Sequence, residues 1–218
     1  FLKKLNIMKF IRDNELSYWD KYYSNKKFQS NSIPSQFAVF AISELNDLKI
    51  SNVIECGAGN GRDSIFFSRY GKNVIALDRS AQAIDSLSKQ TKDISNLNVS
   101  QHDVKDRFPR DVTDLDGLKA FYARFFLHSL DRPSLEMFFE NTATAMNHSD
   151  ILLVEYRNDN DANLPKVTET HYREYYSSKL ISNIAKDNNL SCLYEVSGLG
   201  YAKFKHDDAF VTRQIFTK

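Results

Sequence analysis

Three closely spaced glycines and a preceding acid form the part of the sequence best suited to chemistry. The stretch VIECGAGNGRDSIFF, residues 53–67, places Gly57, Gly59 and Gly61 behind a short apolar run that contains Glu55. Glycines permit positive φ and let backbone N–H groups approach a ligand, and the start of a helix adds unpaired donors for an anion. This spacing predicts a tight turn between a strand and a helix that holds the charged end of a small ligand.

A second glycine-rich turn, the dinucleotide fingerprint G-x-G-x-x-G, competes with this interpretation. It would place its third glycine at position 62, where the sequence has Arg62, a bulky cation in a place that demands a small residue. The third glycine is Gly61 instead. The spacing therefore argues against an NAD-dependent oxidoreductase, which we keep as an alternative that a titration with NAD can exclude.

Acidic residues also follow the next two apolar runs. Asp78 closes the run in KNVIALDRS, about 20 residues beyond the glycines, where nucleotide-binding α/β proteins place an acid for ribose hydroxyls. Asp103 ends the run in LNVSQHDV. Each has a simpler interpretation, because Asp78 lies beside Ser80, a suitable helix N-cap, and Asp103 alone is typical of a solvated loop. Three acids at successive strand ends nevertheless favour a ligand site.

The spacing of Glu55, Gly57, Gly59 and Gly61 resembles the first motif of class I S-adenosylmethionine (SAM) dependent methyltransferases, in which glutamate is a common variant of the usual aspartate. The resemblance implies that Asp103 meets the adenine amino group and that the backbone of the next residue meets a ring nitrogen. The full set that it implies for SAM binding is Glu55, Gly57, Ala58, Gly59, Arg62, Asp78, Arg79, Asp103, Val104 and Trp19.

The N-terminal stretch LSYWDKYYSN, residues 16–25, holds four aromatic residues. Aromatic clusters usually serve packing. Many members of the resembled family cover SAM with an N-terminal lid, which implies that Trp19 faces the cofactor and Tyr23 the substrate. We expect residues 1–34 to form a helical segment or lid and residues 35–218 to form the methyltransferase domain. Because the chain begins at Phe1 and not at Met, a fragment of a longer protein is also among our expectations.

Helices and strands are expected to alternate along the chain. The expected helices are 35–48, 62–70 (with Asp63 and Ser64 capping its start), 80–91, 132–147 and 173–187. The expected strands are 52–56, 73–77, 97–101, 117–123, 150–156, 190–196 and 209–216. The last two strands have no helix between them, which favours antiparallel pairing. We therefore predict an α/β, Rossmann-like class I methyltransferase fold: a seven-stranded, mostly parallel sheet with a C-terminal antiparallel hairpin and helices on both faces.

Cationic and aromatic residues follow the later strands. Arg124 and His128 come just past the fourth strand, and Arg157 comes just past the fifth. Ligands of open α/β sheets bind outside the carboxyl ends of the strands. We therefore predict a site at this edge, although each residue alone is also typical of a surface or, for His128, of a partly buried helix start. The catalytic set is His128, Arg124 and His171, and the substrate-binding set is Tyr23, Arg157, Tyr172 and Arg173.

The function of these residues depends on the methyl acceptor. A hydroxyl acceptor is helped by a general base, for which His128 is the first choice and His171 the second. An anionic acceptor requires no base, and Arg124, Arg157 and Arg173 then orient it.

Composition excludes several other classes of function. With 218 residues, 42% of them hydrophobic, and a net charge of +1, the chain suits one enzyme domain and lacks the basic field of a nucleic-acid-binding protein. Its two cysteines, Cys56 and Cys192, provide neither a disulfide framework nor a metal cluster, so we expect a cytoplasmic protein without a metal. No apolar stretch reaches the length of a membrane span.

The acceptor is predicted by resemblance alone. ARFF stands where the Asp/Asn-Pro-Pro-aromatic signature of amino-group methyltransferases would lie, which argues against methylation of DNA adenine or protein glutamine. Stretches such as GNGRDS, YARFFLHS and HYREYYS resemble bacterial methyltransferases associated with surface-polysaccharide or secondary-metabolite biosynthesis. That resemblance implies O-methylation of a sugar or a phosphorylated glycan unit, with fusion to or complex formation with a glycan-synthesis enzyme. The alternatives are a methyltransferase of small carboxylates or metabolites and a catalytically idle SAM-binding module of a larger glycan-synthesis protein.

Overall fold

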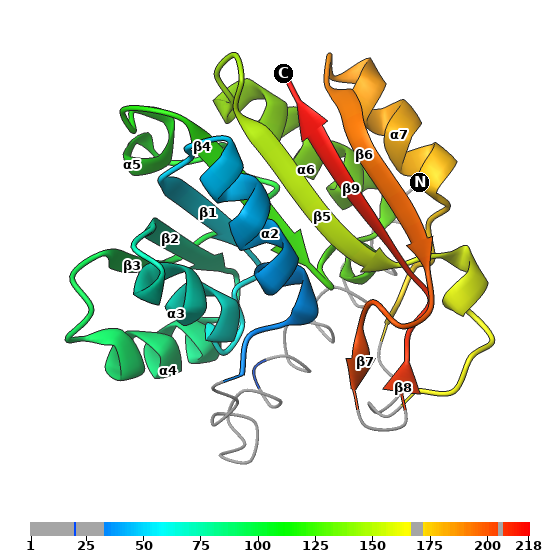
Figure 1. Ribbon diagram of the computed structural model, residues 1–218, viewed down its shortest axis with the longest axis horizontal. Coiled ribbons are helices and arrows are strands. Elements are labelled where there is room, and N and C mark those ends of the chain that lie inside the picture. The colour runs from blue at the N-terminus through cyan, green and yellow to red at the C-terminus, as the bar shows by residue number, and fades with distance from the viewer. Residues whose placement is uncertain (1–19, 21–32, 167–171, 205–206) are drawn as a thin grey trace, which may run out of the picture.

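The computed structural model describes residue 20 and residues 33–166, 172–204 and 207–218. Its main feature is a seven-stranded sheet with the order β3-β2-β1-β4-β5-β9-β6 (Figure 1). Strands β1 to β5 are parallel, and β9 runs antiparallel to both of its neighbours. The strands are β1 (Asn52–Cys56), β2 (Asn73–Asp78), β3 (Leu97–Gln101), β4 (Lys119–Arg124), β5 (Ile151–Arg157), β6 (Ser191–Gly198) and β9 (Val211–Thr217). The predicted fold class is confirmed.

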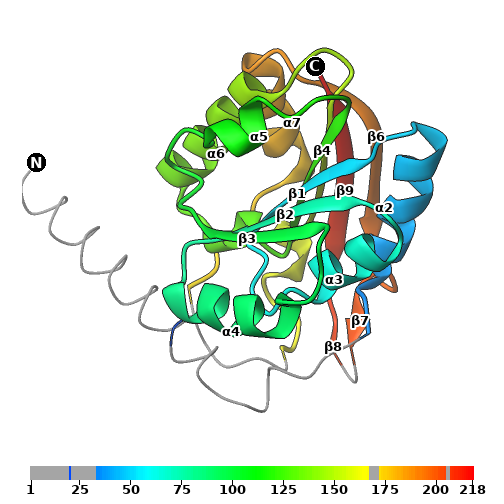
Figure 2. The same cartoon turned by 90° about the vertical axis from the view of Figure 1, so that its left-hand side faces the viewer.

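Helices cover both faces of the sheet (Figure 2). One layer holds α2 (Gln36–Asp47), α3 (Arg62–Arg69) and α4 (Ala81–Thr91), and the other holds α5 (Arg110–Thr113), α6 (Arg132–Ala145) and α7 (Ser178–Asp187). Strand side chains alternate between the faces, so Val53 and Tyr122 pack in the first layer while Ile54 and Phe121 pack in the second. The continuous apolar runs of β1, β4 and β5 follow from burial on both sides.

Side-chain caps fix where most of the longer helices begin. Ser35, Ser80, Asp131 and Ser177 each accept a hydrogen bond from a backbone N–H in the first turn, and Ser80 confirms the predicted cap of α4. Helix α3 is different, because its N-cap is Gly61 and no side chain caps it. The predicted capping of α3 by Asp63 and Ser64 is therefore wrong.

The predicted helix 173–187 is also too long, because α7 begins only at Ser178. The preceding residues bind to the loop after β4 instead. The N–H of Glu174 donates to the carbonyl of His128 at 2.8 Å, and the hydroxyl of Tyr176 donates to the carbonyl of Leu130, also at 2.8 Å. This segment consequently lies against the carboxyl end of β4.

Five short elements of the described residues were not predicted, and the first is helix α5 between β3 and β4. The 3-10 helices η2 (Leu127–Ser129) and η3 (Asp159–Asp161) follow β4 and β5, and β7 (Lys203–Phe204) pairs with β8 (Asp207–Asp208). Among the helices that the structure describes, none combines the length and apolar character that a membrane crossing requires. Most of the predicted N-terminal segment 1–34 lies outside the described residues, so the division into lid and domain stays a prediction.

Candidate active site

The turn between β1 and α3 requires glycine for both conformation and space. Gly57 has φ +77° and Gly61 has φ +69°. A Cβ on Gly61 would lie 2.1 Å from a methyl group of Leu87, and one on Gly57 would lie 2.5 Å from the ring of Phe126. The N–H groups of Gly57 and Ala58 donate to the carbonyl of Leu77 in β2, at 2.8 and 2.9 Å. The turn is thus held tightly between β2, α4 and the loop after β4.

Asp78 joins this turn to the start of α4. One carboxylate oxygen accepts from the N–H of Gly59 and the other from the N–H of Ser80, each at 2.9 Å. Burial raises the pKa of Asp78, and these two N–H groups oppose that rise. The Oγ of Ser80 also donates to the carboxylate of Asp20 at 2.6 Å. Each carboxylate oxygen of Asp78 retains a lone pair, so the group can still accept from a ligand hydroxyl.

Glu55 lies beneath the turn. Its side chain is buried, and the hydroxyl of Ser64 in α3 donates to one of its carboxylate oxygens. Burial, and next the nearby charge of Asp63, raise the pKa of Glu55 well above its ordinary value. Glu55, the acid of the predicted motif, therefore joins β1 to α3 beside the turn in this structure.

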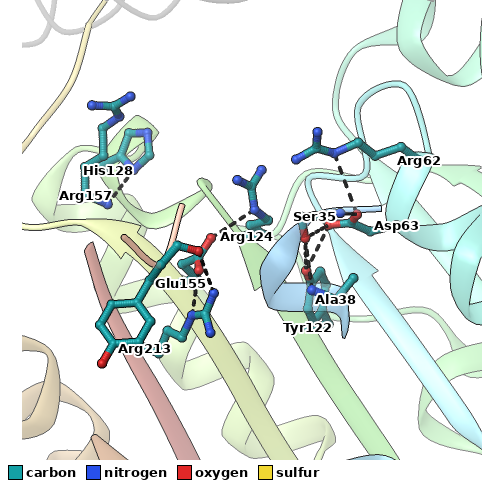
Figure 3. A network of polar contacts seen from close by, with 11 residues as sticks. Ser35, Ala38, Arg62, Asp63, Tyr122, Arg124, His128, Glu155, Arg157 and Arg213 are labelled. Carbon is teal, nitrogen blue, oxygen red and sulfur yellow. Dashed lines mark hydrogen bonds and ion pairs between the residues drawn. The ribbon is translucent and has the colours of Figure 1, made fainter. Parts of the chain in front are cut away.

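Asp63 holds α3 against its neighbours (Figure 3). Its carboxylate accepts from the N–H and the hydroxyl of Ser35, both at 2.7 Å, and from the hydroxyl of Tyr122 at 2.9 Å. These bonds join the start of α2, the start of α3 and the middle of β4. Arg62 forms an ion pair with Asp63 at 3.6 Å, and its guanidinium points toward Arg124 in Figure 3. Burial, and next the charge of Arg124, lower the pKa of Arg62.

The residues predicted to hold adenine lie past the end of β3, as expected, and Asp103 has a local partner. Its carboxylate accepts from the N–H of Lys105 at 3.1 Å and forms an ion pair with the Lys105 ammonium, also at 3.1 Å. Val104 is buried, and its carbonyl accepts from Asn141 of α6 at 3.1 Å. Arg79 follows Asp78, and its carbonyl accepts from Gln101 at 3.0 Å.

A charged ladder that sequence reasoning missed crosses the other half of this edge. Arg124, Glu155 and Arg213 are register partners on β4, β5 and β9. The Nε of Arg124 donates to one oxygen of Glu155 at 2.9 Å, and the Nε of Arg213 donates to the other at 2.7 Å (Figure 3). Glu155 is fully buried. One carboxylate therefore neutralises only one of the two guanidinium charges.

Phe125, the residue after β4, was also missed. Its φ of +52° is rare for a residue other than glycine and is held by a 2.7 Å hydrogen bond from its N–H to the carbonyl of Glu155. The guanidinium carbons of Arg124 and Arg157 lie 4.1 and 5.4 Å from the centre of its ring, and the His128 ring lies edge-on at 5.5 Å. The strained backbone thus places an aromatic ring among three of the predicted site residues.

His128 and Arg157 form more contacts within the protein than the sequence indicated. His128 is buried, and its Nδ1 accepts from the N–H of Arg157 at 3.4 Å. The guanidinium of Arg157 donates to Asp161 at 2.8 Å and to Asp207 at 2.6 Å, and Lys166 adds a second cation to Asp161 at 3.4 Å. The charge of Arg157 is therefore balanced within the protein, and its side chain ties β5 to η3 and β8.

Two of the remaining predicted residues, Tyr172 and Arg173, lie in the segment before α7. The hydroxyl of Tyr172 donates to Glu174 at 2.8 Å, and both Tyr172 and Arg173 are partly exposed. The other three predicted residues lie outside the described part of the chain: Trp19, Tyr23 and His171.

The two halves of the sheet edge carry different side chains. Glu55, Asp78 and Asp103 lie at or just past the ends of β1, β2 and β3, which we call the acidic half. The arginine half has Arg124 and Arg157 at the ends of β4 and β5 and Arg213 near the start of the antiparallel β9. The boundary lies between β1 and β4, where chain connections leave in opposite directions along the sheet. Open α/β sheets bind their ligands at such a switch point.

A groove of about 460 Å³ at the opposite end of the strands is lined by amides such as Asn52 and Asn96, which are already hydrogen-bonded to backbone carbonyls.

Comparisons with known proteins agree with this geometry. A family model described as "Tellurite resistance protein TehB" matches residues 16–114. No curated protein matches the sequence. The N-methyltransferase NodS from Bradyrhizobium japonicum WM9, solved with S-adenosyl-L-homocysteine (SAH), is 15% identical with a TM-score of 0.68, and the match covers 94% of this chain and 98% of that one.

Two further solved structures have the same fold. A SAM-dependent methyltransferase from Anabaena variabilis ATCC 29413 is 16% identical with a TM-score of 0.67, covering 93% of this chain and 94% of that one. The [4+2]-cyclase SpnF is 10% identical with a TM-score of 0.63, covering 83% of this chain and 81% of that one. The described architecture is thus shared with methyltransferases and with a cyclase, so the reaction must be argued from the site.

Proposed function

This chain has the class I SAM-dependent methyltransferase fold, and we propose that it binds SAM and transfers the methyl group to a small acceptor that carries a negative charge. The family model and the SAM-dependent solved structures support the enzyme class and the cofactor. The acidic half of the edge supports the cofactor side of this proposal, and the arginine half supports the acceptor side.

The main support is the fit between the turn and the cofactor. Gly57 and Gly61 keep side chains away from the turn, and the start of α3 has no side-chain cap to occupy its N–H groups. These donors suit the carboxylate of an amino acid, and Asp78 suits two ribose hydroxyls. The carboxyl group of Asp103 and the backbone of Val104 remain the residues that we assign to adenine.

When bound, SAM supplies a methyl group activated by a sulfonium charge. The protein then has to align the acceptor oxygen in line with the breaking sulfur–carbon bond and to exclude water. The sulfur keeps the electron pair of that bond, and the acceptor oxygen supplies the pair for the new bond. An oxygen that is already anionic has no proton to lose during this step.

The geometry of His128 favours such an acceptor. Because Nδ1 accepts from the N–H of Arg157, the proton of the neutral ring lies on Nε2. In this arrangement Nε2 carries the proton, so it can act as a donor and is not available as a base. We therefore favour a phosphorylated glycan unit or a small carboxylate over a neutral sugar hydroxyl. Tellurite, which the family description names, is also an oxyanion.

The cysteines fit a reducing compartment. Cys56 is buried and Cys192 is exposed, and both are free. Free cysteines are the rule in the cytoplasm, where we place the reaction.

Transfer of a labelled methyl group tests this function. The full chain is incubated with methyl-labelled SAM and a panel of nucleotide sugars, phosphorylated glycan fragments, small carboxylic acids and tellurite. We expect label in at least one anionic acceptor and its loss in Asp78→Asn. An idle SAM-binding module would instead bind SAH, label nothing in the panel and tolerate Arg124→Gln and His128→Gln without any change.

A further inference from the structure

We propose, given the methyl transfer proposed above, that Arg124 binds an oxyanion group of the acceptor and that Glu155 and Phe125 position its guanidinium for this purpose. The acceptor is thereby recognised through a carboxylate or a phosphate. The neighbouring Arg62 belongs to the cofactor side of the same boundary.

A count of formal charges identifies Arg124 as the cation that needs an anion. In the ladder, Glu155 is shared by Arg124 and Arg213, which leaves one positive charge in excess. Arg157 and Lys166 are balanced by Asp161 and Asp207. Arg62 pairs with Asp63 at 3.6 Å. Of these three described clusters of arginines, the ladder is the one in which the cations outnumber the carboxylates.

The excess charge is accessible at Arg124 and not at Arg213. Arg213 is buried, and besides its bond to Glu155 it donates to the carbonyl of Tyr201 at 2.8 Å and lies over three aromatic rings. The Arg124 side chain is 16% exposed and uses Nε for Glu155. In the part of the chain that the structure describes, Glu155 is its one ion-pair partner. Its terminal N–H groups therefore remain for a bidentate contact with an oxyanion.

Phe125 keeps the guanidinium in a fixed plane. The ring lies 4.1 Å from the guanidinium carbon of Arg124, a distance at which stacking orients the group. The ring is there because Phe125 adopts φ +52°, an arrangement that costs free energy and persists only where neighbours enforce it. The bond from its N–H to the Glu155 carbonyl does so. The strained backbone of Phe125 thus helps to hold the Arg124 guanidinium at the end of β4.

The position beside the cofactor turn fits an acceptor. Strand β4 is the register neighbour of β1, and the ring of Phe126 lies where a Cβ on Gly57 would be only 2.5 Å away. An oxyanion held by Arg124 would therefore lie at the boundary between the acidic and the arginine halves. The acidic half suits the sulfonium end of the cofactor, and the arginine half suits an anion that approaches it.

The competing occupant is the carboxylate of SAM itself, and calorimetry separates the two. The full chain, saturated with SAH in a low-salt, phosphate-free buffer, is titrated with inorganic phosphate in one arm and sodium benzoate in the other. We expect one anion to bind per chain, and the tighter probe identifies the group as phosphate or carboxylate. We expect Arg124→Gln to weaken this binding about tenfold or more and to change SAH affinity less than about threefold.

Two further variants keep the outcome interpretable. Arg124→Lys retains the charge without the planar fork and is expected to bind the anion a few-fold more weakly than the wild type. Arg132→Gln, which alters an exposed arginine paired with Glu136, is the matched control and should behave as the wild type. Failure of the SAH-saturated wild type to bind either probe, or a tenfold loss of SAH affinity in Arg124→Gln, would overturn the assignment. Failure of the wild type to bind SAH at all would instead refute the proposed function.

Discussion

Arg124 and Glu155 face one another as register partners across β4 and β5, and the Nε of Arg124 donates to Glu155 at 2.9 Å. Glu155 meets Arg213 of β9 in the same way on its other side. Two arginines thus share one fully buried carboxylate at the edge where the ligands are expected. Glu155 therefore stabilises this edge and neutralises one of the two arginine charges, which leaves one positive charge in excess.

Replacing Glu155 should therefore be costly. Glu155→Gln leaves two guanidinium groups without their counter-charge and should lower the free energy of unfolding by roughly 2–4 kcal/mol, less than for a fully buried pair because Arg124 is partly exposed. The exposed pair of Arg132 and Glu136 provides the control, and Glu136→Gln should cost at most about 0.5 kcal/mol. Urea denaturation measures both values. Equal effects of the two substitutions would show that the ladder does not stabilise the fold.

The cofactor turn should resist any side chain at Gly61. Gly61→Ala combines a positive φ, worth about 1–2 kcal/mol, with an overlap with Leu87 that should add about 1–3 kcal/mol. Gly71→Ala isolates the first cost, because Gly71 has φ +77° and no atom within 4 Å of the added Cβ. In a Leu87→Ala background, Gly61→Ala should cost less than in the wild type. If it costs the same there, contact with Leu87 does not explain the glycine.

Removing the negative charge of Asp78 should weaken cofactor binding. Asp78→Asn can no longer accept at both oxygens, so we expect the SAH dissociation constant to rise roughly tenfold or more. Asp85, which is exposed on α4 and paired with Lys89, supplies the control substitution Asp85→Asn. Calorimetry measures the affinities, and circular dichroism checks that each variant folds. An unchanged SAH affinity in Asp78→Asn would remove Asp78 from the site.

The buried carboxyl group of Glu55 should make stability depend on pH. Its pKa is raised above the ordinary value of 4.5, chiefly by burial. The folded chain therefore keeps a proton that the unfolded chain loses, so the contribution of Glu55 to stability is complete below pH 4.5 and decreases as pH rises toward the folded pKa.

Glu55→Gln tests this sign, since a glutamine cannot ionise but can still accept from Ser64. The unfolding free energy of the variant, minus that of the wild type, should increase as pH rises above 4.5. Asp78 also has a raised pKa and is present in both proteins, so the difference reports the titration of Glu55 together with its interaction with Asp63 and Asp78. Urea denaturation from pH 4.5 to about 8 supplies the comparison. A difference that is independent of pH would contradict a raised pKa.

The cofactor half of the site could be predicted because its signals are local. The spacing from Gly57 to Gly61 and the position of Asp78 are patterns within a short stretch of chain. The structure and its likeness to solved SAM-dependent methyltransferases confirm the fold that they predicted. The contacts of these residues with SAM, and the site residues as a set, stay predictions.

The arginine half has no such local signal. Arg124 and Glu155 are 31 residues apart and Glu155 and Arg213 are 58 apart, so their pairing follows only from the order and register of the strands. The positive φ of Phe125 was equally hidden, because such backbone angles are expected of glycine or asparagine.

Local rules gave the wrong cap at the start of α3. Asp63 and Ser64 are suitable cap residues at the start of α3, but tertiary partners bind their side chains. The hydroxyl groups of Ser35 and Tyr122 donate to Asp63, and the hydroxyl of Ser64 donates to Glu55. Ser80 still caps α4 because its hydroxyl oxygen accepts from the N–H of Ala83 while the hydroxyl donates to Asp20.

Binding of the cofactor product is the most direct test of the account. The full chain is titrated calorimetrically with SAH and, in parallel, with NAD. We predict that SAH binds with one molecule per chain and that NAD does not bind. Absence of SAH binding, or saturable binding of NAD in its place, would contradict the assignment of the Gly57 to Gly61 turn to SAM.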